Sequence, residues 1–300
     1  MNRQRNIFRN KKGNNSNRSI SAIVFSLVAF IFGPVISLFL VFGITTILNM
    51  KLGLNELITT TPYNMIISML GYPIILYLLI IINSKLYDGD LSKFGFSSKR
   101  KYVCILKGIG LGIGLVAGLY LLSLIFLALY SITNNKFNFL IVFLFVIGFF
   151  IQGMVEEILM RSIIMNEICN KSNPAIAILT NSLLFSLLHL SAPSVTALSF
   201  FNLFLFGIMF SLIYYITNDM WLTGFAHATW NITLGVILGT EISGQVIENS
   251  LFRTSSTPYK SLLSGGDFGL EGGLIMTIFS TFVILTLIFS TKILKTKRSW

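Results

Sequence analysis

Two adjacent acids, Glu156 and Glu157, lie in a stretch that otherwise has the composition of a membrane span, FLIVFLFVIGFFIQGMVEEILMRSIIM (139–165). A charged side chain at the centre of a membrane helix costs at least about 2.5–3.5 kcal/mol, so a neighbouring pair of acids there indicates function. Arg161 follows Glu157 by four residues, the spacing at which a helix pairs an acid with a base. We therefore expect Glu157 to bind Arg161, and Glu156 to face a cavity where it can act as a general base.

The only two histidines of the chain, His189 and His227, also fall in apolar segments, and Asn231 follows His227 by four residues. His227 and Asn231 therefore share one helical face. Each site alone has a structural interpretation, since His189 can be an interfacial residue and Trp230 can mark the membrane surface near His227. The acids, the histidines and the amide lie on three different apolar segments, which favours one shared functional site.

The composition is that of a polytopic membrane protein, with 54% hydrophobic and 11% charged residues. Since a helical span needs about 20 mainly apolar residues, the sequence predicts an all-α fold of about eight transmembrane helices that enclose a membrane-embedded site. The first span is too long for a signal-peptide core and is expected to be retained. The predicted spans are 20–48, 63–82, 103–131, 138–165, 174–190, 195–217, 220–238 and 272–292.

The net charge of +11 is concentrated in alternate connections. Lysine and arginine gather before the first span, between the second and third spans, and at the C-terminus, so the positive-inside rule predicts that both termini are cytoplasmic. The long connection 240–271 is then external. This placement explains the charge by topology and contact with anionic lipid, so no nucleic-acid partner is predicted. The frequent Ile, Asn, Lys and Phe residues suit an AT-rich genome, and the predicted location is a bacterial plasma membrane.

The domain organisation follows from the same patterns. Residues 1–18 are basic, polar and predicted to be disordered, and residues 19–300 are predicted to form a single transmembrane domain whose polar chemistry is concentrated in 139–239. Gly114 and Gly118 make a GxxxG step in the third span, which predicts close helix approach there.

The three polar motifs also resemble those of a known family. In chain order they are Glu156-Glu157-x-x-x-Arg161, Phe185-x-x-x-His189 and His227-x-x-x-Asn231. This set is similar to that of the CPBP family, the CAAX-protease and bacteriocin-processing intramembrane proteases, also called the Abi family. No motif position is substituted, and the match covers 139–239. The basic connection 91–101 and the GGDFGLEGG stretch (265–273) also look like bacterial members. The resemblance implies an all-helical fold, a membrane-embedded cavity and cleavage of peptide bonds near the membrane.

Peptide hydrolysis needs an activated water and a stabilised oxyanion. Glu156 and His189 can orient and deprotonate water, while His227 and Asn231 can donate hydrogen bonds to the oxyanion, as the resemblance also implies. The expected catalytic residues are Glu156, Glu157, Arg161, His189, His227 and Asn231.

A metal-dependent mechanism is an open alternative, because the family is often labelled metalloprotease. Glu156, His189 and His227 are residue types that can hold Zn²⁺ and leave one position for water. The cofactor expectation is therefore either none or Zn²⁺. The sequence contains no HExxH motif, so the usual zincin arrangement is absent.

Other classes fit the sequence less well. Ser186 and Ser191 lie near His189, but no GxSx-type elbow frames a serine nucleophile. A transporter with a Glu/His proton relay would be expected to show repeated halves, and none is seen. A non-proteolytic scaffold or a bacteriocin-immunity or regulatory protein is the remaining alternative, although inactive family members usually lack motif residues. The expected partners are the lipid bilayer and a membrane-associated peptide or protein, whose identity the sequence does not specify.

Overall fold

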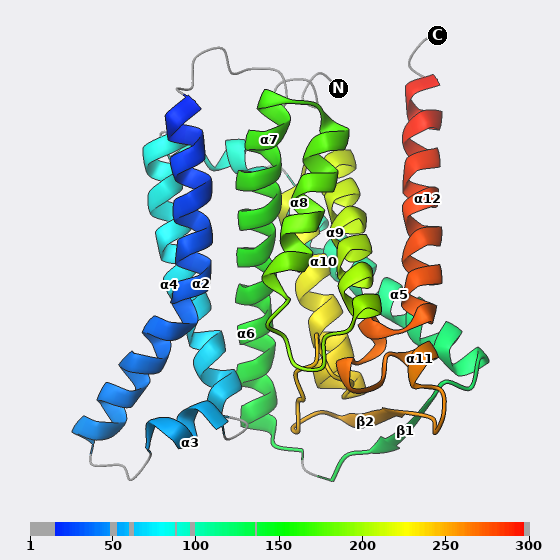
Figure 1. Cartoon of the computed structure of the whole chain (residues 1–300). Helices are drawn as coiled ribbons and strands as arrows, with labels where there is room; N and C mark the ends of the chain where they lie inside the picture. The colour runs from blue at the N-terminus through cyan, green and yellow to red at the C-terminus, as the bar shows by residue number, and fades with distance from the viewer. Residues whose placement is uncertain are drawn as a thin grey trace.

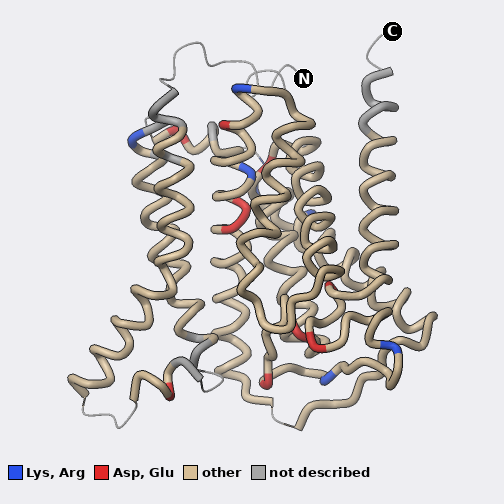
Figure 2. Tube along the Cα trace, viewed as in Figure 1, with Lys and Arg blue, Asp and Glu red and all other residues tan. Residues whose placement is uncertain are grey.

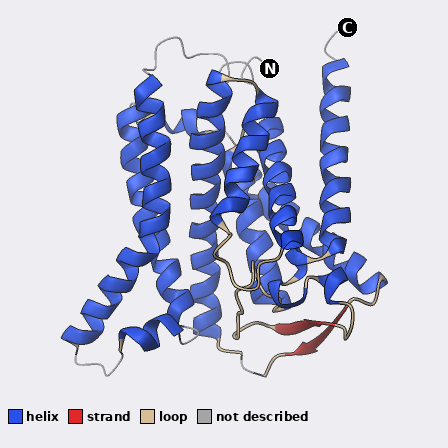
Figure 3. Cartoon of the chain, in the orientation of Figure 1, coloured by secondary structure: helices blue, strands red, loops and turns tan. Residues whose placement is uncertain are grey.

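The structure is a computed structural model that describes residues 16–48, 53–59, 63–87, 89–96, 100–135 and 137–296. Helices fill most of this part of the chain (Figure 3). The α-helices are α2 (Ser16–Ile47), α3 (Leu54–Thr59), α4 (Tyr63–Tyr87), α5 (Lys101–Ile125), α6 (Phe139–Glu157), α7 (Asn166–Lys171), α8 (Pro174–Leu188), α9 (Ala197–Thr217), α10 (Met220–Asn231), α11 (Ser261–Ser264) and α12 (Leu274–Thr296). Residues 1–15 of the predicted tail lie outside the described residues, whereas residues 16–18 already belong to α2.

Several shorter helical segments complete the described chain. Two are π-helical and continue longer helices: η2 (Ile158–Met165) joins α6 to α7, and η3 (Ile232–Leu238) extends α10. The 3₁₀ segments are η1 (Leu91–Phe94), η4 (Gly266–Phe268) and η5 (Leu270–Gly272).

Side-chain caps define where the site-bearing helices begin. The carboxamide of Asn138 accepts from the backbone N–H of Ile141 at the start of α6, and Asn173 caps α8 just before Pro174. The carboxylate of Asp219 accepts from Leu222 N–H at the start of α10. Such oxygen acceptors satisfy backbone N–H groups that have no partner within the helix.

The described helices have the length and composition of a multi-pass membrane protein. The segments long and apolar enough to cross a membrane are Ile23–Ile47, Lys101–Ile125, Phe139–Lys171 and Ala197–Thr217, and the shorter apolar helices are Ile67–Ile82, Pro174–Leu188 and Leu274–Ser290. Helix α10, at the predicted seventh span, is in neither group. Every predicted span overlaps a helix, while the number that cross the bilayer remains a prediction.

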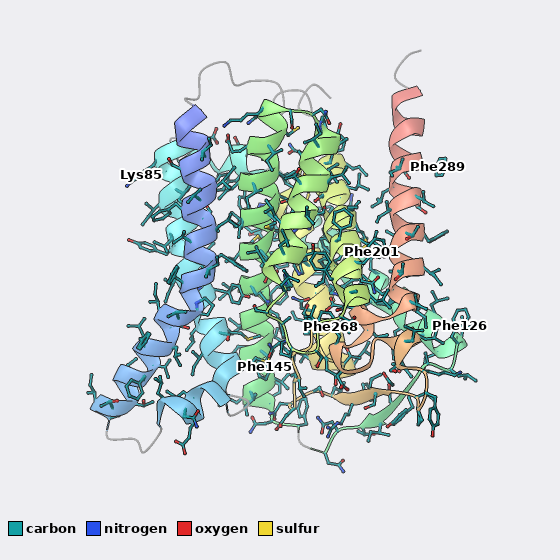
Figure 4. The ribbon with its side chains drawn as sticks, viewed as in Figure 1. Lys85, Phe126, Phe145, Phe201, Phe268 and Phe289 are labelled. Carbon is teal, nitrogen blue, oxygen red and sulfur yellow. The ribbon has the colours of Figure 1, made fainter. Side chains whose placement is uncertain are left out.

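The outer surface of the bundle is apolar, as lipid contact requires. Phe289 on α12 and Phe126 beyond α5 point outward (Figure 4), with 60% and 49% of their surface exposed. Phe145 on α6 and Phe268 in η4 are each 1% exposed and belong to the core. Figure 2 shows that charged positions lie mainly near the ends of the bundle, with an acidic stretch within α6 as the main exception.

The two ends of the described chain lie on one side of the molecule. Helix α2 begins and α12 ends there, while β1 (Leu129–Thr133), β2 (Phe252–Ser256) and α11 lie on the opposite side (Figure 1). This arrangement agrees with a connection 240–271 on the face away from both ends.

A two-stranded sheet is the main departure from the predicted all-α fold. β1 and β2 pair antiparallel, with Leu129 opposite Ser256 and Thr133 opposite Phe252. The predicted third span extended to residue 131, but α5 ends at Ile125 because Leu127 adopts a left-handed conformation with φ 50°. The chain then enters β1 and pairs with the long connection, which the apolar composition alone did not indicate.

Helix α10 lies close to both α5 and α6 because glycine removes the side chain at each contact. A Cβ added at Gly112 of α5 would lie 3.0 Å from the backbone nitrogen of Trp230, and one at Gly153 of α6 would lie 2.6 Å from that of Ala228. These approaches place the His227–Asn231 segment beside the Glu156–Glu157 segment.

Of the two glycines of the Gly114–Gly118 step, only Gly118 lies at a close helix contact. A Cβ at Gly114 would meet nothing within 4 Å, and one at Gly118 would meet the Phe279 ring of α12 at 3.1 Å. The glycines that face α10 are Gly108 and Gly112, which also stand four residues apart. Composition shows that α5 is rich in glycine, but spacing alone does not show which glycine face meets a neighbour.

Candidate active site

The six predicted site residues converge from three helical segments, and four of them line one cavity. The cavity has a volume of about 560 Å³. Glu156 from α6, His189 at the end of α8, and His227 and Asn231 from α10 all contribute to its wall. Apolar residues of α2 and α4, among them Phe30 and Met69, form the facing wall.

Glu156 is held by hydrogen bonds from two neutral donors. The hydroxyl of Tyr72 in α4 donates to Oε1 at 3.2 Å, and the Gln152 amide, one turn earlier in α6, donates to the same oxygen at 3.0 Å. Oε2 lies 3.8 Å from Nε2 of His227. The carboxylate is 3% exposed and lines the cavity, so it is positioned to bind a water molecule there.

Glu157 faces the interior and contacts two basic side chains, Arg161 and His227. Only the contact with Arg161 was predicted. Its Oε1 lies 2.9 Å from Nη1 of Arg161 and 2.8 Å from Nδ1 of His227. Glu157 and Arg161 are both fully buried. The expected Glu157–Arg161 pair is therefore present, and His227 is a second partner that helical spacing did not indicate.

Arg161 lies among aromatic rings behind the site. Its guanidinium carbon is 5.2 Å from the ring centre of Phe185 and 5.9 Å from that of Phe210, and Nη2 donates to the carbonyl of Gly207 at 3.3 Å. Cation–π contacts and one backbone acceptor thus supplement the carboxylate of Glu157 in compensating a buried charge.

The hydrogen bond from Nδ1 to Glu157 determines the chemistry available at His227. A carboxylate accepts, so Nδ1 carries the proton, and Nε2 is the nitrogen that faces Glu156 and the cavity. In the neutral ring Nε2 is an acceptor, whereas in the doubly protonated ring both nitrogens donate. His227 can therefore donate to an oxyanion only as an imidazolium.

His189 is oriented in a comparable way at the C-terminal end of α8. Its Nδ1 lies 2.8 Å from the carbonyl oxygen of Phe185, which must accept, so Nε2 is left for the cavity. The ring centre of Phe185 is 4.6 Å from that of His189 and 6.3 Å from that of His227. Phe185 thus packs against both histidine rings, which gives the aromatic position of the Phe185-x-x-x-His189 motif a role at the site.

Asn231 completes the wall of the cavity. The residue is 3% exposed, and its side chain makes no hydrogen bond to another residue in the part of the chain that the structure describes. Two of the three motif-bearing helices become π-helical at their motif: α6 does so after Glu157, within the Glu156–Arg161 motif, and α10 does so directly after Asn231. π-Helical turns often occur at functional sites because they change the direction in which side chains project.

The metal-binding alternative is not supported by the arrangement of these side chains. Among the described residues, no three His, Cys, Asp or Glu side chains come together in a group suited to a metal ion. Glu156 and His227 approach each other, and the Nδ1 bonds leave Nε2 of each histidine for the cavity, as metal-ligating histidines also do.

Sequence reasoning missed several polar residues of the cavity, among them Tyr72, Gln152 and Glu271. Tyr72 and Gln152 read as ordinary members of apolar spans, although Gln152 precedes Glu156 by one helical turn, which is a usable signal. Glu271 lies in the long connection between α10 and α12, and its carboxylate accepts from the Trp230 indole at 2.8 Å. The one sequence signal in that region was the resemblance of the glycine-rich 265–273 stretch to bacterial family members.

The comparisons with known proteins agree with this geometry. Residues 136–233 match the family model described as "Rce1-like: Type II CAAX prenyl endopeptidase Rce1-like". This central region is Rce1-like. The match confirms the resemblance to the CAAX-protease family, and it contains all six predicted site residues while excluding Tyr72 and Glu271. No curated protein and no solved structure matches the chain.

Proposed function

We propose that the protein is an intramembrane endopeptidase that hydrolyses peptide bonds of membrane-associated peptides or proteins with a water activated by Glu156 and His189. The observation that carries this proposal is the convergence of Glu156, His189, His227 and Asn231 on one cavity inside an apolar helical bundle. The Rce1-like match over the same region supports the reaction class.

In the proposed reaction, Glu156 removes a proton from a bound water, and the water oxygen attacks the carbonyl carbon of the scissile bond. The Tyr72 and Gln152 hydrogen bonds to Oε1 keep the carboxylate in one orientation and leave Oε2 toward His227. His189 presents Nε2 to the same water. The proton then passes to the leaving nitrogen, and the C–N bond breaks.

The developing oxyanion is stabilised by donors on α10. Asn231 offers its amide N–H groups, which have no acceptor among the described residues. His227 offers Nε2–H when the ring is doubly protonated, with Nδ1–H donating to Glu157. Glu157 and Arg161 act through His227, since they lie behind the ring and do not line the cavity.

The cavity wall also supports a membrane-associated substrate. Its α2 and α4 side is apolar, with Phe30, Val35, Leu38, Met65 and Met69 among the lining residues. An apolar wall facing the carboxylate of Glu156 suits a peptide that reaches the site from the bilayer.

The test compares the membrane peptidome of cells that make the wild-type protein with that of cells that make Glu156→Gln. The variant is expected to accumulate uncleaved substrate at unchanged protein abundance, because the amide keeps the side-chain shape but cannot take a proton. Asp267→Asn, an exposed acid outside the cavity, is the matched control and should behave as wild type. A peptidome unchanged by Glu156→Gln would reject the endopeptidase in favour of a scaffold or immunity protein.

A second measurement uses the purified protein on a peptide found in that comparison. Asn231→Ala should lower kcat roughly 10²–10³-fold with little change in KM, which is the usual effect of removing one oxyanion donor. Thr223→Ser, on the same helix but outside the cavity, should retain wild-type kinetics. A change confined to KM would place Asn231 in substrate binding instead.

A further inference from the structure

The connection between α10 and α12 forms the floor of the cavity and brings a second carboxylate to it. Ile242, Ser243, Gln245 and Glu271 of this connection line the same cavity as Glu156. Glu271 is only 5% exposed. It lies outside the region that matches the Rce1-like family, and the proposed mechanism gives it no role.

Glu271 is fixed by three hydrogen bonds from neutral donors. Oε1 accepts from Nε1 of Trp230 at 2.8 Å, and Oε2 accepts from the backbone N–H of Ser243 at 2.9 Å and from its hydroxyl at 3.2 Å. Trp230 immediately precedes Asn231 in α10. The carboxylate is therefore held beside the helix that carries the proposed oxyanion donors.

The backbone at Glu271 is anchored as well. Asn202 of α9 donates to the carbonyl of Glu271 at 2.9 Å and to that of Gly273 at 2.8 Å. Thr277 in α12 in turn donates to Oδ1 of Asn202 at 2.6 Å. Backbone and side chain are thus both fixed, so the position of this carboxylate at the cavity is well defined.

The charge of Glu271 has no partner in the described part of the chain. Glu157 is paired with Arg161, whereas no lysine or arginine is within ion-pair distance of Glu271, and none lines the cavity. Neutral donors reduce the cost of burying a carboxylate but do not balance its charge. With Glu156, it makes two acidic groups in the cavity, where the basic side chains among the described residues are His189 and His227.

We propose that Glu271 is a recognition site for a positively charged group of the substrate, a lysine or arginine side chain or a free α-amine close to the scissile bond. This inference rests on the proposed endopeptidase function and specifies its substrate class. A cation from the substrate supplies the missing counter-charge in a water-poor site, where charge complementarity discriminates strongly between ligands. Substrates with an acidic group at that position are repelled by Glu156 and Glu271.

The test uses the full-length protein in lipid vesicles and a quenched fluorescent peptide that wild type cleaves and Glu156→Gln does not. Lysine, glutamine or glutamate is placed in turn at each of the three positions on either side of the scissile bond. At one position, lysine should give a kcat/KM at least about tenfold above glutamine, with glutamate lowest. In Glu271→Gln the ratio of lysine to glutamine should fall to about one. Asp267→Asn, an acid of the same connection that does not line the cavity, should keep the wild-type ratio.

A second variant covers the case in which Glu271→Gln fails to fold, because that carboxylate also holds Trp230 and Ser243. Gln245 lines the cavity with an exposed side chain that makes no hydrogen bond to a described residue. Gln245→Lys supplies a cation from the protein and should reduce the preference for lysine peptides and improve cleavage of glutamate peptides.

The outcomes separate the two proposals. Equal cleavage of the three peptides by wild type, or an unchanged preference in folded Glu271→Gln or Gln245→Lys, would overturn cation recognition and leave the endopeptidase intact. If no peptide is found that wild type cleaves and Glu156→Gln does not, the endopeptidase proposal fails. Binding of the labelled lysine, glutamine and glutamate peptides to the wild-type protein then tests Glu271 alone, and equal affinities would overturn cation recognition as well.

Discussion

One carboxylate oxygen of Glu157 contacts both Arg161 and His227, so the positions of both side chains depend on this residue. Glu157→Gln leaves the fully buried Arg161 without its counter-charge and weakens the hold on His227. We expect a loss of about 3–5 kcal/mol in stability, the usual cost of removing one partner of a buried ion pair. Thermal unfolding in detergent micelles measures this effect.

The matched variant for this prediction is Glu156→Gln. Glu156 bonds to the neutral donors Tyr72 and Gln152, and an amide oxygen can replace its Oε1. Its unfolding temperature should therefore stay near that of wild type while activity is lost. Equal destabilisation by the two substitutions would show that the two acids do not have the separate roles assigned to them.

At the residue scale, the sequence predicted the charged part of the site and missed its neutral supports. An acid or histidine in an apolar span is visible because burying it is costly, so Glu156, Glu157 and His227 stood out. Tyr72 did not, because a tyrosine in a span is compatible with core packing, and its hydrogen bond to Glu156 joins residues far apart in the sequence. Glu271 appeared to belong to a loop, and only the folded connection brings it to the cavity.

At the element scale, α4 contributes to the site through Tyr72. The Tyr72 hydroxyl is one of two donors to Glu156, and its ring packs edge-on against Phe30 of α2 at 6.2 Å. Tyr72→Phe keeps the ring and removes the donor, and one hydrogen bond is worth about 0.5–1.5 kcal/mol. We expect kcat to fall several-fold, roughly two- to tenfold, with KM and unfolding temperature nearly unchanged.

Tyr77→Phe is the control for that measurement, because Tyr77 lies on the same helix with 64% of its surface exposed. It should leave kcat at the wild-type value. If Tyr72→Phe also does so, Gln152 alone is sufficient to orient Glu156, and α4 only closes the cavity.

The position of α10 depends on the glycine face of α5. Gly112→Ala places a methyl group 3.0 Å from Trp230 N and closer still to Thr229, so α10 must shift. Overpacking of this kind costs typically about 1–3 kcal/mol. Gly114→Ala meets open space and should be neutral or slightly stabilising, since alanine favours a helix over glycine by up to about 1 kcal/mol.

Unfolding temperatures of the two alanine variants, measured side by side, test this assignment. The opposite order, with Gly114→Ala the less stable, would return the helix contact to the face that the GxxxG step indicated. Spacing predicted that α5 has a glycine face, but choosing between two faces requires knowledge of the neighbouring helix. The same limit applies to β1, since strand pairing with residues more than 100 positions away has no local signal in Leu129–Thr133.

At the scale of the whole molecule, the positions of the chain ends and of the basic residues predict how the protein is oriented in the membrane. The ends of the described chain lie on one face, and β1, β2 and α11 lie on the other (Figure 1). Lys85 lies in the last turn of α4, Arg100 and Lys101 lie at the start of α5, and Lys171 ends α7. From the positive-inside rule we predict that the face with both chain ends is cytoplasmic.

This topology predicts opposite labelling of two surface sites. Tyr259, fully exposed beside β2, lies in the connection between α10 and α12, and Ser172 is exposed just after α7. In a variant without Cys104 and Cys169, Tyr259→Cys should react with a membrane-impermeant maleimide in intact cells. Ser172→Cys should react only after permeabilisation. The reverse pattern would place the cavity floor, with Glu271, on the cytoplasmic side, so that a cationic substrate segment would have to approach from within the cell.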